Sequence, residues 1–121
     1  MALTANQLVE HARGRIVEIA PHAFAAEGAG AVLIDVREPA EFATGHLPGA
    51  VNIPRGVLEF QVGSHPALAG PPRPIVLYCR SGGRAALAAL SLSMLGFDGV
   101  RSLTGGIMGW TEADLPVVVP E

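Results

Sequence analysis

Apolar residues occur along this chain in short runs that polar, glycine-rich or proline-rich segments separate. Five of the runs are rich in branched aliphatic residues and predict β-strands, which lie at residues 15–19, 31–36, 51–53, 75–78 and 100–103. The run at 31–36 is continuously apolar, which is typical of a parallel strand buried on both faces. Because helix-like segments alternate with the strands, the pattern predicts an α/β fold with a mainly parallel five-stranded sheet and helices on both faces.

The helices are predicted from their boundary residues as well as from their apolar positions. Thr4 and Gln7 form a capping-box pattern at the start of a short N-terminal helix. The longest helix follows the fourth strand and is apolar nearly all round, so we expect it to be largely buried and to end at Gly96 in a left-handed conformation. Other helical segments are predicted at 21–28, 39–42, 55–60 and 107–113, whereas 61–73 is rich in Gly and Pro and is predicted to be a loop.

Composition and charge exclude several classes of partner. Half of the residues are hydrophobic and 16% are charged, which indicates one compact domain over residues 1–121. A net charge of -3 without a basic cluster gives no reason to expect nucleic acid. A single cysteine suits a reducing compartment, the first residues lack a signal-peptide pattern, and the weakly polar run at 85–97 is too short for a bilayer. We therefore expect a cytoplasmic protein with no membrane partner, and, since no histidine has metal-ligand spacing, no metal or other cofactor.

The chemistry of the chain is expected at that cysteine, Cys79, which lies between the fourth strand and the longest helix. Ser81, Gly82 and Gly83 allow a tight turn in which successive backbone N–H groups point at one centre and form an anion-binding nest. Arg80, Arg84 and the helix N-terminus favour thiolate over thiol. The alternative is that Cys79 is a small buried hydrophobic residue, but the sequence around it favours a reactive thiolate.

Three further stretches accompany the loop Cys79–Arg84. They are Asp35–Phe42 (DVREPAEF), Gly45–Pro54 (GHLPGAVNIP) and Leu103–Trp110 (LTGGIMGW). These four stretches, in the order in which they occur along the chain, resemble the rhodanese (sulfurtransferase) family. With the strands between them they cover residues 15–121 and leave 1–14 as an N-terminal helical extension. The resemblance implies a rhodanese-like fold in its single-domain form, and Gly105 and Gly106 are expected to bring the backbone close to the Cys79 loop.

The resemblance also implies an activity. Cys79 would take a sulfane sulfur from a small anionic donor, thiosulfate or a similar compound, and pass it as a persulfide to cyanide or to a thiol, including a protein thiol. Arg80 and Arg84 would neutralise the charge where thiolate and donor meet, while the amides of Ser81, Gly82 and Gly83 would bind the persulfide. For Arg84, a role in orienting the loop stays equally open.

Asp35, Arg37 and His46 are predicted to give structural support. Asp35 and Arg37 follow the second strand, and an ion pair with backbone hydrogen bonds would hold that loop, because buried charges need partners. His46 is a conceivable general base for a thiol. A thiolate already stabilised by arginines and amides needs no base, so we assign His46 a structural role.

Two other classes of function stay open. A cysteine phosphatase or arsenate reductase also holds its thiolate in an anion nest, and a rhodanese-like module can act by binding or regulation without catalysis. The presence of Cys79 speaks against the second class. Loop length speaks against the first, because the cysteine phosphatases that resemble this arrangement have one residue more between the cysteine and the arginine than the stretch Arg80–Gly83 provides here.

Overall fold

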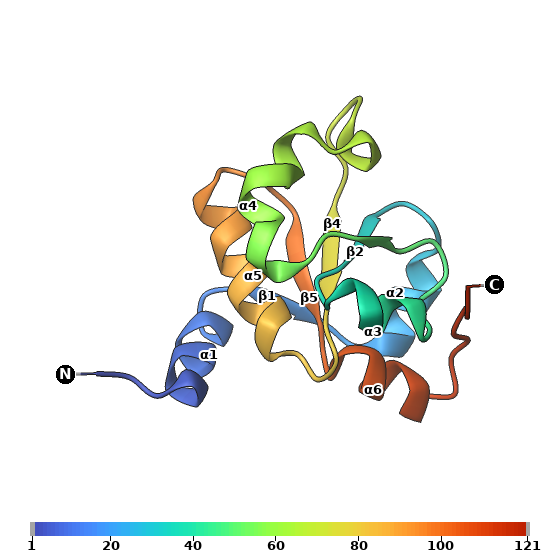
Figure 1. The fold of residues 1–121 in the computed structure, drawn as a ribbon, viewed down its shortest axis with the longest axis horizontal. Coiled ribbons are helices and arrows are strands. Elements are labelled where there is room, and N and C mark those ends of the chain that lie inside the picture. Colours follow the sequence, from blue (N-terminus) through green and yellow to red (C-terminus); the bar gives the residue numbers. More distant parts are fainter. Residues whose placement is uncertain (1, 121) are drawn as a thin grey trace.

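The computed structural model describes residues 2–120, which fold around one five-stranded parallel sheet (Figure 1). The strands are β1 (Val17–Ile19), β2 (Val32–Asp35), β3 (Val51–Asn52), β4 (Ile75–Tyr78) and β5 (Val100–Leu103), in the spatial order β1-β5-β4-β2-β3. Every neighbouring pair is parallel, which confirms the predicted α/β fold. The buried strands β2 and β4 are adjacent at the centre, so their carboxyl ends lie side by side.

Six α-helices and three 3₁₀ turns connect and cover the strands in the described part of the chain. The helices are α1 (Ala5–Arg13), α2 (Pro21–Glu27), α3 (Pro39–Ala43), α4 (Leu58–Gln61), α5 (Gly83–Met94) and α6 (Gly106–Glu112), and the 3₁₀ turns are η1 (Arg55–Val57), η2 (Val62–Ser64) and η3 (Pro66–Leu68). The prediction of a loop over 61–73 was therefore wrong for its first half. Pro66 starts η3 with a preset φ, and the His65 Nδ1 accepts a hydrogen bond from the Ala67 N–H.

Two apolar cores lie on the two faces of the sheet. One core includes Ile34 and Leu77 from the central strands and is covered by alanines and Leu92 of α5 and by Leu58 of α4. The other includes Leu33 and Val76 and is covered by Phe24 of α2 and Trp110 of α6. Alternate residues of one strand thus enter opposite cores, as the period of two requires.

The predicted end of the longest helix and the predicted start of the first helix are confirmed. Gly96 follows α5 with φ +91°, and the Phe97 N–H donates to the Leu92 carbonyl at 3.1 Å, which closes the last turn. The Thr4 side chain and the Gln7 side chain cap α1 reciprocally, and α1 packs against α5. No helix of residues 2–120 combines the length and the apolar character that crossing a membrane requires.

Candidate active site

Cys79 lies at the carboxyl end of β4, where the chain leaves the sheet and turns into α5. Its Sγ accepts hydrogen bonds from the Gly82 N–H at 3.0 Å and the Ala85 N–H at 3.4 Å. The cysteine is only 1% exposed. The loop therefore wraps backbone donors around the sulfur, and each such donor stabilises the thiolate more than the thiol.

The donors differ from those expected from the sequence. Gly82 was expected to contribute its amide, and it reaches the sulfur with φ +117°, a conformation that favours glycine. Within residues 2–120, Ser81 and Gly83 make no hydrogen bond to Sγ, and the second donor is Ala85, in the first turn of α5. The sulfur therefore has one donor from the loop and one from the first turn of α5.

A second turn holds the cysteine loop from the side of β5. The Ile107 N–H donates to the Cys79 carbonyl at 2.9 Å, and the Met108 N–H donates to the Arg80 carbonyl at 3.1 Å. Gly106 makes this approach possible, since it has φ +59° and a Cβ there would overlap the Cys79 carbonyl and lie 2.6 Å from that of Arg80. The expected close approach of this turn to the Cys79 loop is confirmed for Gly106.

Arg84 forms an ion pair with a residue to which the sequence assigned no role. Its Nη1 and Nη2 donate to the two carboxylate oxygens of Glu41 on α3, at 2.8 and 3.1 Å. These hydrogen bonds lower the pKa of Glu41 to about 2 and raise the pKa of Arg84. The two side chains are about one-third exposed, so the pair links α3 to the cysteine loop at the rim of the site.

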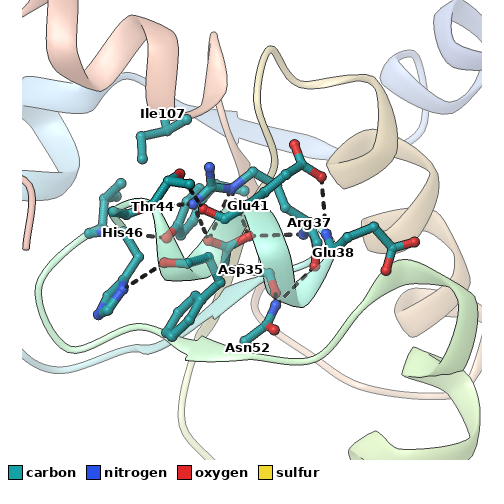
Figure 2. Close-up of polar contacts among 12 residues, drawn as sticks. Asp35, Arg37, Glu38, Glu41, Thr44, His46, Asn52 and Ile107 are labelled. Carbon is teal, nitrogen blue, oxygen red and sulfur yellow. Dashed lines mark hydrogen bonds and ion pairs between the residues drawn. The ribbon is translucent and has the colours of Figure 1, made fainter. Parts of the chain in front are cut away.

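Asp35 and Arg37 form a buried ion pair beside the loop (Figure 2). Asp35 is 0% exposed, and it accepts from the Arg37 backbone N–H at 2.8 Å and from the guanidinium at 2.7 Å. Arg37 also donates to the Gly45 carbonyl, and the Asn52 side chain donates to the carbonyls of Asp35 and Arg37. Burial opposes the charge of Arg37, but the hydrogen bonds and the charge of Asp35 raise its pKa overall. These contacts tie the segment after β2 to Gly45, which follows α3, and to Asn52 of β3.

His46 contacts Phe42, four residues before it, and Val118. Its ring stacks on Phe42 with a centroid separation of 3.9 Å, and its Nδ1 lies 3.3 Å from the Phe42 carbonyl. Its backbone pairs with Val118, which places the chain's last described residues against this loop. None of these contacts joins His46 to Cys79.

Arg80 is the exposed cation of the loop. Within residues 2–120 its side chain makes no ion pair, in contrast to those of Arg37 and Arg84. Together with Glu41, Ile107 and Met108, it lines an open pocket of about 870 Å³ between α3 and α6. Cys79 is buried and does not line this pocket.

The Glu41 pair makes stability depend on acid pH. The lowered pKa of Glu41 means that the pair contributes fully above about pH 4.5, the ordinary value, and is lost as the pH falls toward 2. We expect Glu41→Gln to be less stable than the wild type at pH 7, by less than about 1 kcal/mol because solvent screens the pair, and the two proteins to converge near pH 2. Urea unfolding at several pH values measures this. Glu18→Gln, on an exposed position of β1, is the control and should show no such convergence.

Sequence reasoning missed Glu41, Asn52 and Ala85. Glu41 and Asn52 lie in stretches that resemble the family, which was the one signal that could have pointed to them. Their hydrogen-bond partners lie in other elements, so the sequence did not reveal their contacts. Ala85 contributes only a backbone amide, which leaves no mark in the sequence.

The fold and this site define an α/β protein with one cysteine held under backbone amides at the carboxyl edge of a parallel sheet. The family comparison agrees, since the rhodanese-like domain matches residues 22–113, and the chain belongs to that family. A sulfurtransferase of Allochromatium vinosum is 38% identical over 90 residues, covering 74% of this chain and 80% of that protein. The thiosulfate sulfurtransferase GlpE of Shewanella oneidensis is 33% identical over 112 residues, covering 93% of each. These relatives support a rhodanese-type sulfurtransferase.

Among solved structures, a protein from Rhodopseudomonas palustris CGA009 superposes with a TM-score of 0.85 at 25% identity. The match covers 98% of this chain and 96% of that one. It is described as a protein of unknown function and a possible tyrosine phosphatase. The fold similarity therefore leaves the phosphatase question to the details of the site.

Proposed function

We propose that this protein moves a sulfane sulfur from thiosulfate or a similar anionic donor to cyanide or a thiol acceptor through a persulfide on Cys79. The observation that carries the proposal is the pair of backbone amides, Gly82 and Ala85, directed at the Cys79 sulfur. Such donors stabilise the thiolate, which is the nucleophile. The named sulfurtransferase relatives support the same chemistry.

The reaction is a double displacement. The Cys79 thiolate attacks the outer sulfur of thiosulfate, a new S–S bond forms at Sγ, and the old S–S bond breaks with its electron pair leaving on sulfite. Cyanide or a thiolate then attacks the outer sulfur of the persulfide and releases the Cys79 thiolate. Thiolate and donor are both anions in the first step, so the site must offset their repulsion.

Arg80 is the residue proposed to offset it. It is exposed at the border of the pocket and, within the described residues, has no ion-pair partner, so its guanidinium is available to an oxyanion. Arg84 was expected either to bind substrate or to orient the loop. Its two-point pairing with Glu41 favours the orienting role, because the nitrogens that would hold an anion already donate to a carboxylate. Asp35 and Arg37 are proposed to give structural support after β2, and His46 after α3.

The ion pair between Arg84 and Glu41 also disfavours the phosphatase alternative. A tetrahedral phosphate needs a wide ring of donors and a free arginine at its end. Here the ring is one residue shorter and Arg84 is occupied by Glu41.

The lone cysteine also supports a cytoplasmic location, where a reducing environment keeps such a thiol free.

Intact mass spectrometry after incubation with thiosulfate tests the proposal. We expect the mass to rise by one sulfur atom and to return to its starting value on adding cyanide, while p-nitrophenyl phosphate is not hydrolysed. Cys79-dependent hydrolysis of that ester with no sulfur uptake would overturn the proposal in favour of a phosphatase. A protein that takes up no sulfur and hydrolyses nothing would point to the non-catalytic module.

Replacing Arg80 with alanine should weaken use of thiosulfate. We expect the KM for thiosulfate to rise by about tenfold, the typical effect of losing one charge-assisted contact, with little change in stability because the side chain is exposed. Steady-state kinetics with varied thiosulfate at fixed cyanide measures it. Arg80→Lys keeps the charge and should retain most of the affinity, and an Arg80→Ala protein with an unchanged KM would remove Arg80 from the donor site.

A further inference from the structure

The C-terminal end of α1 lies against the outer side of the cysteine loop, although this helix precedes the family match at residues 22–113. The Arg13 Nη2 lies 3.2 Å from the point where a Cβ on Gly82 would stand, and a Val9 methyl lies 3.7 Å from the equivalent point on Gly83. Ala12 between them is 0% exposed. The guanidinium therefore occupies the space beside the one loop residue whose N–H makes the shorter hydrogen bond to the Cys79 sulfur.

The charge of Arg13 is less neutralised than that of Arg37 or Arg84. Arg37 is paired within a buried network and Arg84 with both oxygens of Glu41. Arg13 makes one ion pair, 3.0 Å from its Nη1 to Glu10, and Glu10 is 70% exposed, so solvent screens that carboxylate strongly. The Arg13 Nε is buried and makes no hydrogen bond within the described residues. A positive charge is thus held at the loop by packing and not by a strong partner.

We propose that Arg13 is a positioning residue for Cys79: it packs against Gly82 from outside the loop and adds positive charge behind the amides that face the sulfur, which favours the thiolate. The role in catalysis rests on the proposed sulfur transfer. The effect of Arg13 on the thiolate does not depend on sulfur transfer. An experiment can therefore contradict the role of Arg13 without contradicting the proposed function, and the reverse. The charged groups around the loop are Arg80 and Arg84 of the loop and α5, Arg13 and Glu10 of α1, Glu41 of α3, and Asp35 with Arg37 after β2.

The test follows the thiolate directly by its ultraviolet absorbance as a function of pH, with Cys79→Ser as the blank. Because Cys79 is the single cysteine, the signal has one source. In Arg13→Met, which keeps an apolar stem against the loop, we expect the midpoint of thiolate formation to rise by about half a pH unit, a threefold change in the equilibrium. Arg13→Lys should stay near the wild type. Glu10→Gln removes a carboxylate that solvent already screens, so it should leave the midpoint near that of the wild type.

The matched control is Arg15→Met, because Arg15 lies just after the same helix and its side chain contacts the exposed His11. It should leave the midpoint unchanged. Equal shifts for Arg13→Met and Arg15→Met would mean a general effect of net charge and would overturn the proposal, as would an unchanged midpoint in Arg13→Met. If Arg13→Met detached α1, seen as lost helix by circular dichroism, Arg13→Gln would take its place, and an unshifted midpoint in that folded variant would contradict the electrostatic role.

Discussion

Cys79→Ser is expected to abolish sulfur transfer, with a fall in turnover of at least about 10³-fold, because a hydroxyl forms no persulfide and no second thiol exists in the chain. The fold should persist. A serine oxygen accepts hydrogen bonds from the N–H groups of Gly82 and Ala85 as the sulfur does, so these two amides keep an acceptor. Thiocyanate formation from thiosulfate and cyanide measures the loss, and near-ultraviolet circular dichroism checks the fold.

The control restores a thiol elsewhere. Ser93 is exposed on α5, one residue before the end of the helix, and its side chain makes no hydrogen bond within residues 2–120. The double variant Cys79→Ser with Ser93→Cys has one cysteine, as the wild type does, but that cysteine lacks the ring of amides. It should remain inactive. Substantial activity in the double variant would mean that any thiol suffices and that the loop contributes nothing.

The sheet and the cysteine loop were predictable because their signals are local. The run 75–78 is apolar, prolines precede it, and the helix-forming residues after Gly83 follow at once, so strand, turn and helix can each be recognised from neighbours in the chain. The strand ends at Tyr78 and the helix starts at Gly83 in the structure. Since ligands bind at the carboxyl ends of parallel strands, the position of Cys79 also predicted the site's place in the fold.

The partners of the loop were not predictable for the opposite reason. Arg84 and Glu41 are 43 positions apart in the sequence and meet only because β2 and β4 are neighbours in the sheet. Arg13 reaches Gly82 because α1 packs on α5, and the pattern of α1 alone fixes its apolar face but not what that face covers. The resemblance to a family did not supply these contacts either, since its motif gives residue types at the loop and not their ion pairs.

Gly106 sets how closely the turn after β5 approaches the cysteine loop, and we expect its replacement by alanine to damage both stability and activity. The residue has φ +59°, and the added Cβ would overlap the Cys79 carbonyl and lie 2.6 Å from the Arg80 carbonyl. These atoms are backbone and cannot swing aside. The loop or α6 must shift, which would break the hydrogen bonds from Ile107 and Met108 to the loop carbonyls.

The cost of a positive φ must be separated from the cost of the overlap. Gly49 has φ +79° with nothing within 4 Å of its added Cβ, so Gly49→Ala should cost only about 1 kcal/mol of unfolding free energy. Gly106→Ala carries the same backbone penalty plus the overlap and should cost more than about 3 kcal/mol. Urea unfolding compares the two. Sulfur transfer per folded molecule should stay normal in Gly49→Ala and fall by more than about tenfold in Gly106→Ala, because a displaced loop no longer directs its amides at Cys79. Equal stability and activity in the two variants would show that the turn does not hold the loop.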